Sequence, residues 1–406
     1  MDSAVPEPFG ADPFTSHKPN GSGPAPLWID DDAWTEGDLP QRPWVAQGYA
    51  LRGAVTIVTG PPSAMKSSLM LAWACATALG QPHGNFRPTE AGDVIVYNVE
   101  DNQIEQRRRL SAVLRQFDAI PGDIRGKIIR AGPGGIGTLF SWNVEMGVVL
   151  NTAALDTLRA LIEERRPAIL IADPLSELHS ADENDNTALR AVVAEFRALA
   201  ICYNVAIILV HHTRKGAVTP GDPDTARGAS AIIGAGRVVL TLVTMSEEDA
   251  VALGLAKDRK TRSTYVRLDD AKQNYAAIGE ANWYEKTVYA LDNGEWVPAA
   301  VPWTAPDMWE SIPTVTANEI LDTINAGIDG GKRRYSDGGN AGDRAAWPVV
   351  AKHIPSLNEK QARKAITTWV DNGTLISRQY TDETDRKKRK GLYLSDDPKK
   401  RPGNAQ

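Results

Sequence analysis

A Lys-Ser pair follows a glycine at P-loop spacing within residues 55–68. The segment begins with an apolar, β-branched run that ends at Gly60. Lys66 and Ser67 come next, before an apolar helical stretch closed by Gly80. In such a strand, loop and helix, backbone N–H groups and the helix N-terminus face phosphate oxygens. We therefore expect Lys66 to reach the β- and γ-phosphates of a nucleoside triphosphate and Ser67 to hold Mg²⁺.

The loop departs from the usual pattern at one position. Met65 stands where a glycine normally precedes the lysine, and glycine is favoured there because the backbone closely approaches phosphate. Methionine can fit if its side chain turns outward; the alternatives are an inactive loop or an accidental match. The flanking strand and helix favour a nucleotide site. Its residues are Gly60, Pro61, Pro62, Ser63, Ala64, Met65, Lys66, Ser67 and Ser68.

Two carboxylates follow later apolar strands. The run 93–99 ends at Glu100, and the run 168–172 ends at Asp173. Ligands of parallel α/β sheets bind beyond the carboxyl ends of the strands. We expect Glu100 to orient or activate an attacking water, and Asp173 to bind Mg²⁺ through water as a Walker B carboxylate. The alternative for Glu100 is an ordinary solvated acid.

Histidines and basic residues follow the next predicted strand. His211 and His212 would lie beside the γ-phosphate and could report its presence to a neighbouring loop. That loop, 215–228, is rich in Gly, Pro and Asp, and Arg214 and Lys215 could contact nucleic-acid phosphates. A plain surface loop is the alternative. We do not expect zinc, because the chain has 6 histidines and no cysteine near this pair.

The alternation of short apolar runs with helical segments predicts an α/β domain with a mainly parallel sheet over residues 43–300. The expected strands are 55–59, 94–99, 169–172, 206–210 and 238–243, with 265–268, 283–285 and 288–291 as further strands of an antiparallel edge.

Other segments differ in composition. Residues 1–42 are rich in Pro, Gly, Ser and Asp, and we expect a disordered arm. Four prolines within 298–316 predict a linker, set at 301–316. Residues 317–396 then form a smaller domain, and 397–406 form a tail.

Five elements occur in one order: the loop 60–68, Glu100, Asp173, His211-His212 and the run 227–230. Together they resemble the RecA-type ATPase core of hexameric helicases, closest to the plasmid RepA-like replicative helicases and their phage and prophage relatives. The resemblance covers about residues 43–300, and Met65 departs from it. It implies a RecA-like P-loop NTPase fold, ATP and Mg²⁺ as cofactors, and a homo-hexamer with ATP between adjacent subunits.

The resemblance also implies residue roles. Lys66 and Ser67 would bind the phosphates and Mg²⁺, and Asp173 would complete the metal site. Glu100 would be the catalytic carboxylate. His212, or alternatively His211, would link the γ-phosphate to the DNA loop.

An arginine finger should come from the neighbouring subunit. Arg237, at the start of the strand 238–243, is the first candidate, with Arg227 and Arg259 as alternatives. The stretch 270–274 resembles the Lys-x-Arg element of DnaB-type helicases, but it keeps only Lys272 and has Asn274 in place of arginine. A surface ion pair is the alternative for each arginine.

The C-terminal segment predicts three helices and a hairpin. Helical spacing is found over 316–324, 344–353 and 358–370, and Asn358 with Gln361 forms a capping-box pattern. Strands are expected at 375–380 and 392–394. This order resembles a winged-helix domain.

Basic residues concentrate on two of these elements. The third helix would enter the major groove, and the wing tip would grip backbone phosphate. The candidate contacts are Lys360, Arg363, Lys364, Arg386, Lys387, Lys388, Arg389 and Lys390. A winged helix used for protein contacts is the alternative.

The charge balance agrees with a polyanion partner for this end of the chain. Residues 331–401 hold 17 basic and 9 acidic side chains, a net of +8, whereas the remainder holds 28 and 42, a net of −14. No apolar run has membrane-spanning length, and no secretory signal pattern begins the chain. Cys75 and Cys202 are expected to be reduced core residues of a cytoplasmic protein.

These observations predict a DNA-dependent, ATP-hydrolysing homo-hexamer, with single-stranded DNA in the ring and duplex DNA on the winged helix. Its role would be a replicative or accessory helicase of a phage or mobile element. The alternatives are an ATP-switched DNA-binding regulator or loader without unwinding activity, and a scaffold with a decayed P-loop.

Overall fold

The computed structural model describes residues 34–132, 137–143, 145–182, 185–213, 220–221, 230–277, 279, 281–305, 312–355 and 357–403. The chain divides into two compact units, Met1–Arg42 and Pro43–Gln406. In the first unit, the described residues include a 3₁₀ helix, η1 (Glu36–Asp38), which Thr35 and Asp38 close as a capping box.

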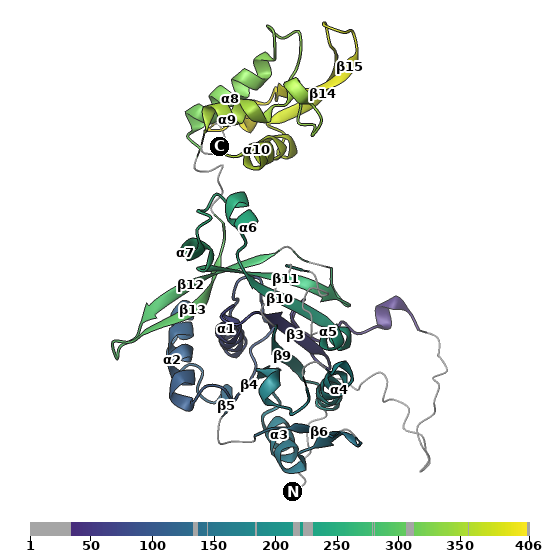
Figure 1. Cartoon of the computed structure of the whole chain (residues 1–406), viewed down its shortest axis with the longest axis vertical. Coiled ribbons are helices and arrows are strands. Elements are labelled where there is room, and N and C mark those ends of the chain that lie inside the picture. Colours follow the sequence, from purple (N-terminus) through teal and green to yellow (C-terminus); the bar gives the residue numbers. More distant parts are fainter. Residues whose placement is uncertain are drawn as a thin grey trace. The chain divides into compact units, whose positions relative to one another are not determined.

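A nine-stranded mixed sheet forms the centre of the α/β part of the chain (Figure 1). The strand order is β13-β12-β11-β10-β3-β9-β8-β4-β5. Strands β10 to β5 in this order are parallel, and β11, β12 and β13 are antiparallel. The predicted α/β fold with a mostly parallel sheet is therefore confirmed. The strands are β3 (Val55–Gly60), β4 (Val94–Asn98), β5 (Ile128–Ala131), β8 (Ile169–Asp173), β9 (Ala206–His212), β10 (Val238–Thr244), β11 (Tyr265–Gln273), β12 (Asn282–Ala290) and β13 (Trp296–Trp303).

Alternating side chains give the sheet two separate cores. Val58 and Val94 belong to the core that includes α1 (Lys66–Leu79) and α2 (Gln103–Leu114), on one face of the sheet. Ile57 and Ile95, one residue away on the same strands, belong to the core with α3 (Thr152–Arg165) and α4 (Asn186–Cys202). Burial on both faces explains why the strands are continuous apolar runs rather than alternating ones.

Smaller elements complete the α/β part. The helices are α5 (Ser230–Ala235), α6 (Glu247–Ala252), α7 (Arg259–Arg262), η2 (Arg115–Phe117) and η3 (Leu175–Glu177). The remaining strands are β1 (Trp44–Ala46), β2 (Ala50–Leu51), β6 (Phe140–Asn143) and β7 (Gly147–Leu150).

The antiparallel edge differs from the sequence prediction. The expected strands 283–285 and 288–291 are one strand, β12, and the following strand β13 was missed because its prolines indicated a linker. Residues 301–303 of the predicted linker therefore belong to the sheet. Pro298 and Pro302 are tolerated because β13 is an edge strand, where a missing N–H need not break the ladder.

The C-terminal part has a core of its own, formed by three helices and a hairpin. The elements are α8 (Thr314–Ala326), η5 (Gly342–Arg344), α9 (Trp347–His353), α10 (Glu359–Asp371), β14 (Leu375–Thr381), β15 (Lys388–Leu394) and η6 (Pro398–Lys400). Asn358 and Gln361 close the predicted capping box at the start of α10.

Two boundaries in this part were predicted wrongly. The helix expected from residue 344 begins at Trp347, with Pro348 in its first turn, because Arg344 ends a 3₁₀ helix and Ala345, with ψ at 134°, is not helical. Strand β15 begins at Lys388 instead of residue 392. Part of the basic run 386–390 thus lies along a strand and not at the tip of the hairpin.

Cys75 is buried in α1, as expected, but Cys202 is exposed at the last residue of α4. The prediction of a core position for Cys202 was therefore wrong. Among the helices that the structure describes, none has the length and apolar character needed to span a bilayer.

Candidate nucleotide site

The loop after β3 has the shape of a phosphate cradle. Strand β3 ends at Gly60 and α1 begins at Lys66, so the loop connects the centre of the sheet to a helix N-terminus. Ser63 and Met65 adopt positive φ angles of 66° and 62°. Glycine reaches this left-handed region at no steric cost, which gives a second physical reason for its usual place before the lysine. Met65 nevertheless occupies that conformation here.

Gly60 is required by a close backbone approach. A Cβ atom at this position would lie 2.2 Å from the carbonyl oxygen of Leu242 in the adjacent strand β10. Any side chain would therefore separate the two strands at the point where the loop begins.

Lys66 is buried and holds the loop closed. Its Nζ donates hydrogen bonds to the carbonyl oxygens of Gly60, at 2.8 Å, and Pro61, at 2.9 Å. Burial lowers the pKa of Lys66 to about 8, although Asp173 and Glu100 act in the opposite direction. The ammonium group is thus poorly hydrated, so an arriving phosphate replaces backbone carbonyls rather than bulk water.

Asp173 is the last residue of strand β8, and its buried side chain lies next to that of Ser67. A hydrogen bond joins the Ser67 and Asp173 side chains, and the Oδ1 atom of Asp173 has no partner among the described residues. Burial raises the pKa of Asp173 to about 6, against the effects of the Ser67 hydrogen bond and Lys66. A buried carboxylate with an unused oxygen beside a hydroxyl suits Mg²⁺, which prefers oxygen ligands. The residues present therefore fit the expected metal.

Glu100 follows β4 and His212 ends β9, the two strands on either side of β8, and their side chains approach each other. The Oε1 atom of Glu100 lies 3.9 Å from Nε2 of His212, the last residue of β9. Burial, followed by the charges of Asp101 and Glu177, raises the pKa of Glu100, while Arg109 and Lys66 lower it. A carboxylate with a raised pKa is a better general base for water. Burial and then Lys66 lower the pKa of His212, which favours a neutral imidazole.

The structure distinguishes between His211 and His212, which the sequence left as alternatives for the γ-phosphate sensor. His212 lines the cavity beside Lys66 and Glu100. His211 points into the interior: it is 3 % exposed, and burial lowers its pKa to about 4. The geometry therefore favours His212 as the residue in contact with a bound nucleotide.

Of the predicted residues, Glu100, His212 and residues 63–68 line one cavity of about 360 Å³, whereas Gly60, Pro61, Pro62 and Asp173 do not line it. This volume is within the range of small-molecule sites, roughly 300–1,000 Å³. Five lining residues were missed by the sequence analysis. They are Glu105, Arg109, Lys286, Val297 and Pro298.

Only some of these five lining residues could have been identified from the sequence. Arg109 is held by Asp101, at 2.8 Å, and by Glu105, at 3.1 Å, and its position one helical turn after Glu105 could have been noticed. Lys286, Val297 and Pro298 come from β12 and β13, and no local pattern connects that hairpin to the loop 60–68.

Arg237 lies away from this cavity. It directly precedes β10, which runs parallel to β3, so it is at the amino end of the sheet while the loop 60–68 follows the carboxyl end. Lys272 bonds the carbonyl oxygens of Ile233, Gly234 and Gly236 at the end of α5. Arg214, Lys215 and Arg227 lie outside the described residues.

The C-terminal candidates differ in exposure. Lys360 and Lys364 are exposed on α10. Arg363 is half-buried, because it pairs with Glu359 at 2.8 Å and its guanidinium lies 5.6 Å from the ring centroid of Trp347. Arg386, Lys387, Lys388 and Lys390 are exposed, whereas Arg389 is half-buried.

Residues 23–218 match the family model described as "AAA domain". The matched span contains the loop 60–68, Glu100, Asp173 and His212, the residues that the fold brings together. This part of the chain is therefore similar to AAA-type, P-loop ATPase domains, which supports nucleotide binding and ATP hydrolysis at the cavity. The match ends before β10.

Nucleotide binding and turnover should depend on different residues of the site. Lys66→Ala should weaken ATP binding by at least about 100-fold, because it removes the buried cation from the phosphate site. Glu100→Gln should keep the Kd within a few-fold and lower kcat by about 10² to 10⁴, because an amide cannot accept the water's proton. Equilibrium binding and steady-state phosphate release measure the two effects. Wild-type turnover in Glu100→Gln would remove this residue from catalysis.

The backbone at Met65 already has the left-handed conformation that glycine favours. Met65→Gly should change the Kd for ATP by less than about tenfold, because the left-handed conformation is already formed. Met65→Val should destabilise the loop by about 1–3 kcal/mol and weaken binding, since β-branched residues strongly disfavour positive φ. Thermal unfolding and ATP titration test both variants. A large gain of affinity in Met65→Gly would mean that the methionine side chain obstructs phosphate.

Proposed function

We propose that this protein is an ATP-hydrolysing, DNA-dependent oligomeric motor, acting as a replicative or accessory DNA helicase of a phage or mobile element. The observation that carries the ATPase part is the convergence of Lys66, Ser67, Glu100 and His212 on one cavity, with Asp173 bonded to Ser67. The similarity of residues 23–218 to the AAA domain supports the same conclusion.

Each residue of the site would have its own role in ATP hydrolysis. Lys66 exchanges the carbonyls of Gly60 and Pro61 for phosphate oxygens, and the backbone amides at the start of α1 bind the same anion. Ser67 and Asp173 would hold Mg²⁺, which offsets the charge of the phosphates when bound. Glu100 takes a proton from the attacking water, and neutral His212 lies where it can sense whether the γ-phosphate is present.

Assembly into a ring would complete the site. Arg237 is exposed at the amino end of the sheet and so cannot serve its own cavity, which fits an arginine finger donated to a neighbouring copy. Arg227 and Arg259 remain alternatives. Arg214 and Lys215 would contact single-stranded DNA inside the homo-hexamer.

The C-terminal part would bind duplex DNA as a winged-helix domain. Three helices followed by an antiparallel hairpin support this proposal, with α10 entering the major groove and the hairpin β14–β15 as the wing. Lys360 and Lys364 provide exposed cations on α10. The positive charge of residues 331–401 agrees with a polyanion partner.

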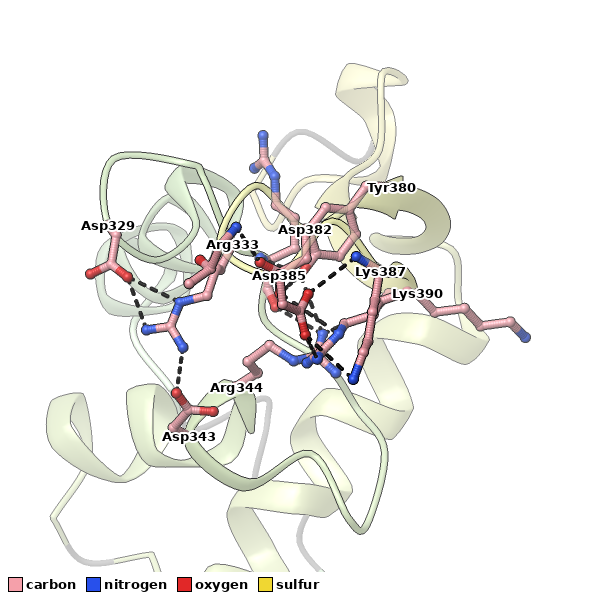
Figure 2. Close-up of polar contacts among 12 residues, drawn as sticks. Asp329, Arg333, Asp343, Arg344, Tyr380, Asp382, Asp385, Lys387 and Lys390 are labelled. Atoms are coloured by element: carbon pink, nitrogen blue, oxygen red, sulfur yellow. Dashed lines mark hydrogen bonds and ion pairs between the residues drawn. The ribbon is translucent and has the colours of Figure 1, made fainter.

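Internal ion pairs reduce the number of wing cations that can reach DNA. Figure 2 shows Asp382 and Asp385 close to Tyr380 and Lys387 at the hairpin. Arg389 approaches both acids, at 3.7 Å from the buried carboxylate of Asp382 and 2.5 Å from Asp385. Arg389 therefore holds the hairpin together, and we assign the DNA contacts to Arg386, Lys388 and Lys390.

The alternative function is an ATP-switched DNA-binding regulator or loader that does not unwind DNA. It would use the same cavity with slow hydrolysis. We place either activity in the cytoplasm, where an exposed thiol such as Cys202 stays reduced.

Stimulation by DNA distinguishes the two functions. We expect single-stranded DNA to raise the ATPase rate at least about tenfold, because in a motor the DNA contact lowers the barrier of the hydrolytic cycle, by about 1.4 kcal/mol for each factor of ten. Phosphate release is measured with and without the oligonucleotide, beside native mass measurements in ATP. A monomeric protein whose ATPase rate does not change with DNA would contradict the motor and favour the regulator or loader.

The wing assignment predicts different effects for neighbouring cations. Lys388→Gln with Lys390→Gln should lower the slope of log K for duplex DNA against log salt by about 2, close to 0.9 for each lost phosphate contact. Arg389→Gln is the matched control. It should leave the slope nearly unchanged but lower the Tm, because buried Asp382 loses a partner. A lower salt slope in Arg389→Gln, with an unchanged slope in the Lys388 and Lys390 double variant, would mean that Arg389 is the DNA contact.

A further inference from the structure

Met65 is the residue at which this phosphate loop departs from its usual pattern, and the proposed ATPase reaction gives its side chain no role. Its φ of 62° lies in the left-handed region, which bulky residues rarely adopt. A rarely adopted backbone conformation at a binding site points to a function of the residue that occupies it. The thioether of Met65 is the chemical group that distinguishes this loop from one with glycine at the same place.

Met65 contacts both the apolar core and the nucleotide cavity. Its side chain is half-buried and packs against the core that includes α1. The same residue lines the cavity next to Lys66 and Ser67, the proposed ligands of phosphate and Mg²⁺. A change in the polarity of this side chain would therefore affect the packing of the loop and the binding of a triphosphate together.

The other methionines that the structure describes lack this combination. Met70 and Met245 are each 1 % exposed, so a solute in water does not reach them. Met146 is 70 % exposed, between β6 and β7, and does not line the cavity. Among the described methionines, solvent access and the nucleotide site therefore coincide at Met65 alone.

A thioether reacts with peroxides in a two-electron step. A lone pair on the Met65 sulfur attacks one oxygen of hydrogen peroxide, the O–O bond breaks, and water is released. The sulfur is oxidised to the sulfoxide and the peroxide is reduced. The flexible apolar side chain becomes a polar, chiral one, and methionine sulfoxide reductases restore the thioether.

A sulfoxide at Met65 would oppose both contacts of this side chain. The S=O oxygen carries partial negative charge and requires a hydrogen-bond donor, which the apolar core does not provide. If the oxygen faces the cavity instead, it meets the phosphate oxygens, which are also negative. In either direction, oxidation weakens the binding of a triphosphate beside Lys66.

We propose that Met65 is a peroxide-sensitive modification site, at which oxidation to the sulfoxide weakens triphosphate binding and bound nucleotide protects the thioether. This inference rests on the proposed function, because it requires ATP to bind in this cavity. ATP binding by the chain then depends on peroxide, through a side chain that stands where P-loops usually have glycine.

Treatment of the full-length protein with hydrogen peroxide tests the site. Wild type, Met65→Leu, Met65→Gly and Met146→Leu are treated with and without Mg²⁺-ATP, freed of both reagents, and titrated with a fluorescent ATP analogue. Treatment without ATP should raise the Kd of the wild type and of Met146→Leu at least about tenfold. The Kd of Met65→Leu and of Met65→Gly should stay within about twofold of its own untreated value, since neither side chain has a thioether. ATP present during treatment should preserve the affinity of the wild type.

Two controls identify the modified group. Peptide mass spectrometry shows which methionines have gained oxygen, and a methionine sulfoxide reductase should return the oxidised wild type to its original Kd. Dithiothreitol before the titration reduces a sulfenic acid or disulfide at exposed Cys202 but leaves a sulfoxide in place. A loss of affinity that persists in dithiothreitol and disappears with the reductase therefore comes from methionine.

Several results would overturn the proposal. They are a Met65 that peroxide leaves unoxidised, an oxidised Met65 with an unchanged Kd, and an equal loss of affinity in Met65→Leu. Oxidation of Met65 at the same rate with and without ATP would overturn the protection by nucleotide. An untreated wild type that binds no ATP would instead contradict the proposed function, whereas a wild type that binds ATP and is insensitive to peroxide would contradict this inference alone.

Discussion

The buried ammonium group of Lys66 is the interaction on which the nucleotide site depends. It bonds two carbonyl oxygens of its own loop, and those carbonyls follow directly from the central strand β3. The sheet positions β3 between β9 and β10, so the location of the loop is set by backbone pairing on both sides. A cation placed in this way meets an anion without reorganising the sheet, and that preorganisation is what an electrostatic site requires.

The carboxylates near Lys66 compensate its positive charge only in part. Asp173 is almost completely buried and Glu100 partly so, and burial raises the pKa of both. The lowered pKa values of Lys66 and His212 have the same origin, since burial disfavours their charged forms. Lys66 and Asp173 are therefore poorly solvated, whereas Glu100 remains exposed. Triphosphate and metal would supply the missing charge partners, so binding should also stabilise the fold.

The sequence predicted the central part of this molecule because its signals are local. The loop 60–68, the strands ending at Glu100 and Asp173, and the capping box at Asn358 each depend on residues close together in the chain. The missed features depend on distant contacts. Strand β13 contains prolines that are acceptable only at a sheet edge, and the place of Lys286 in the cavity wall depends on where that strand packs. The ion pairs of Arg389 join residues close together in the chain, but they still depend on the turn of the hairpin, which brings Asp382 and Asp385 to the guanidinium.

The outer edge of β13 has a consequence for how copies of this protein can associate. Residues 298, 300 and 302 direct their backbone groups away from β12. Ala300 donates its N–H to the Ser68 hydroxyl and accepts at its carbonyl oxygen from His83, while Pro298 and Pro302 have no N–H. Over this stretch the edge offers no spare donor to another strand, and edges of that kind resist strand addition. Any second copy that approached this stretch would therefore contact it through side chains and not by adding a strand, which also disfavours edge-to-edge aggregation.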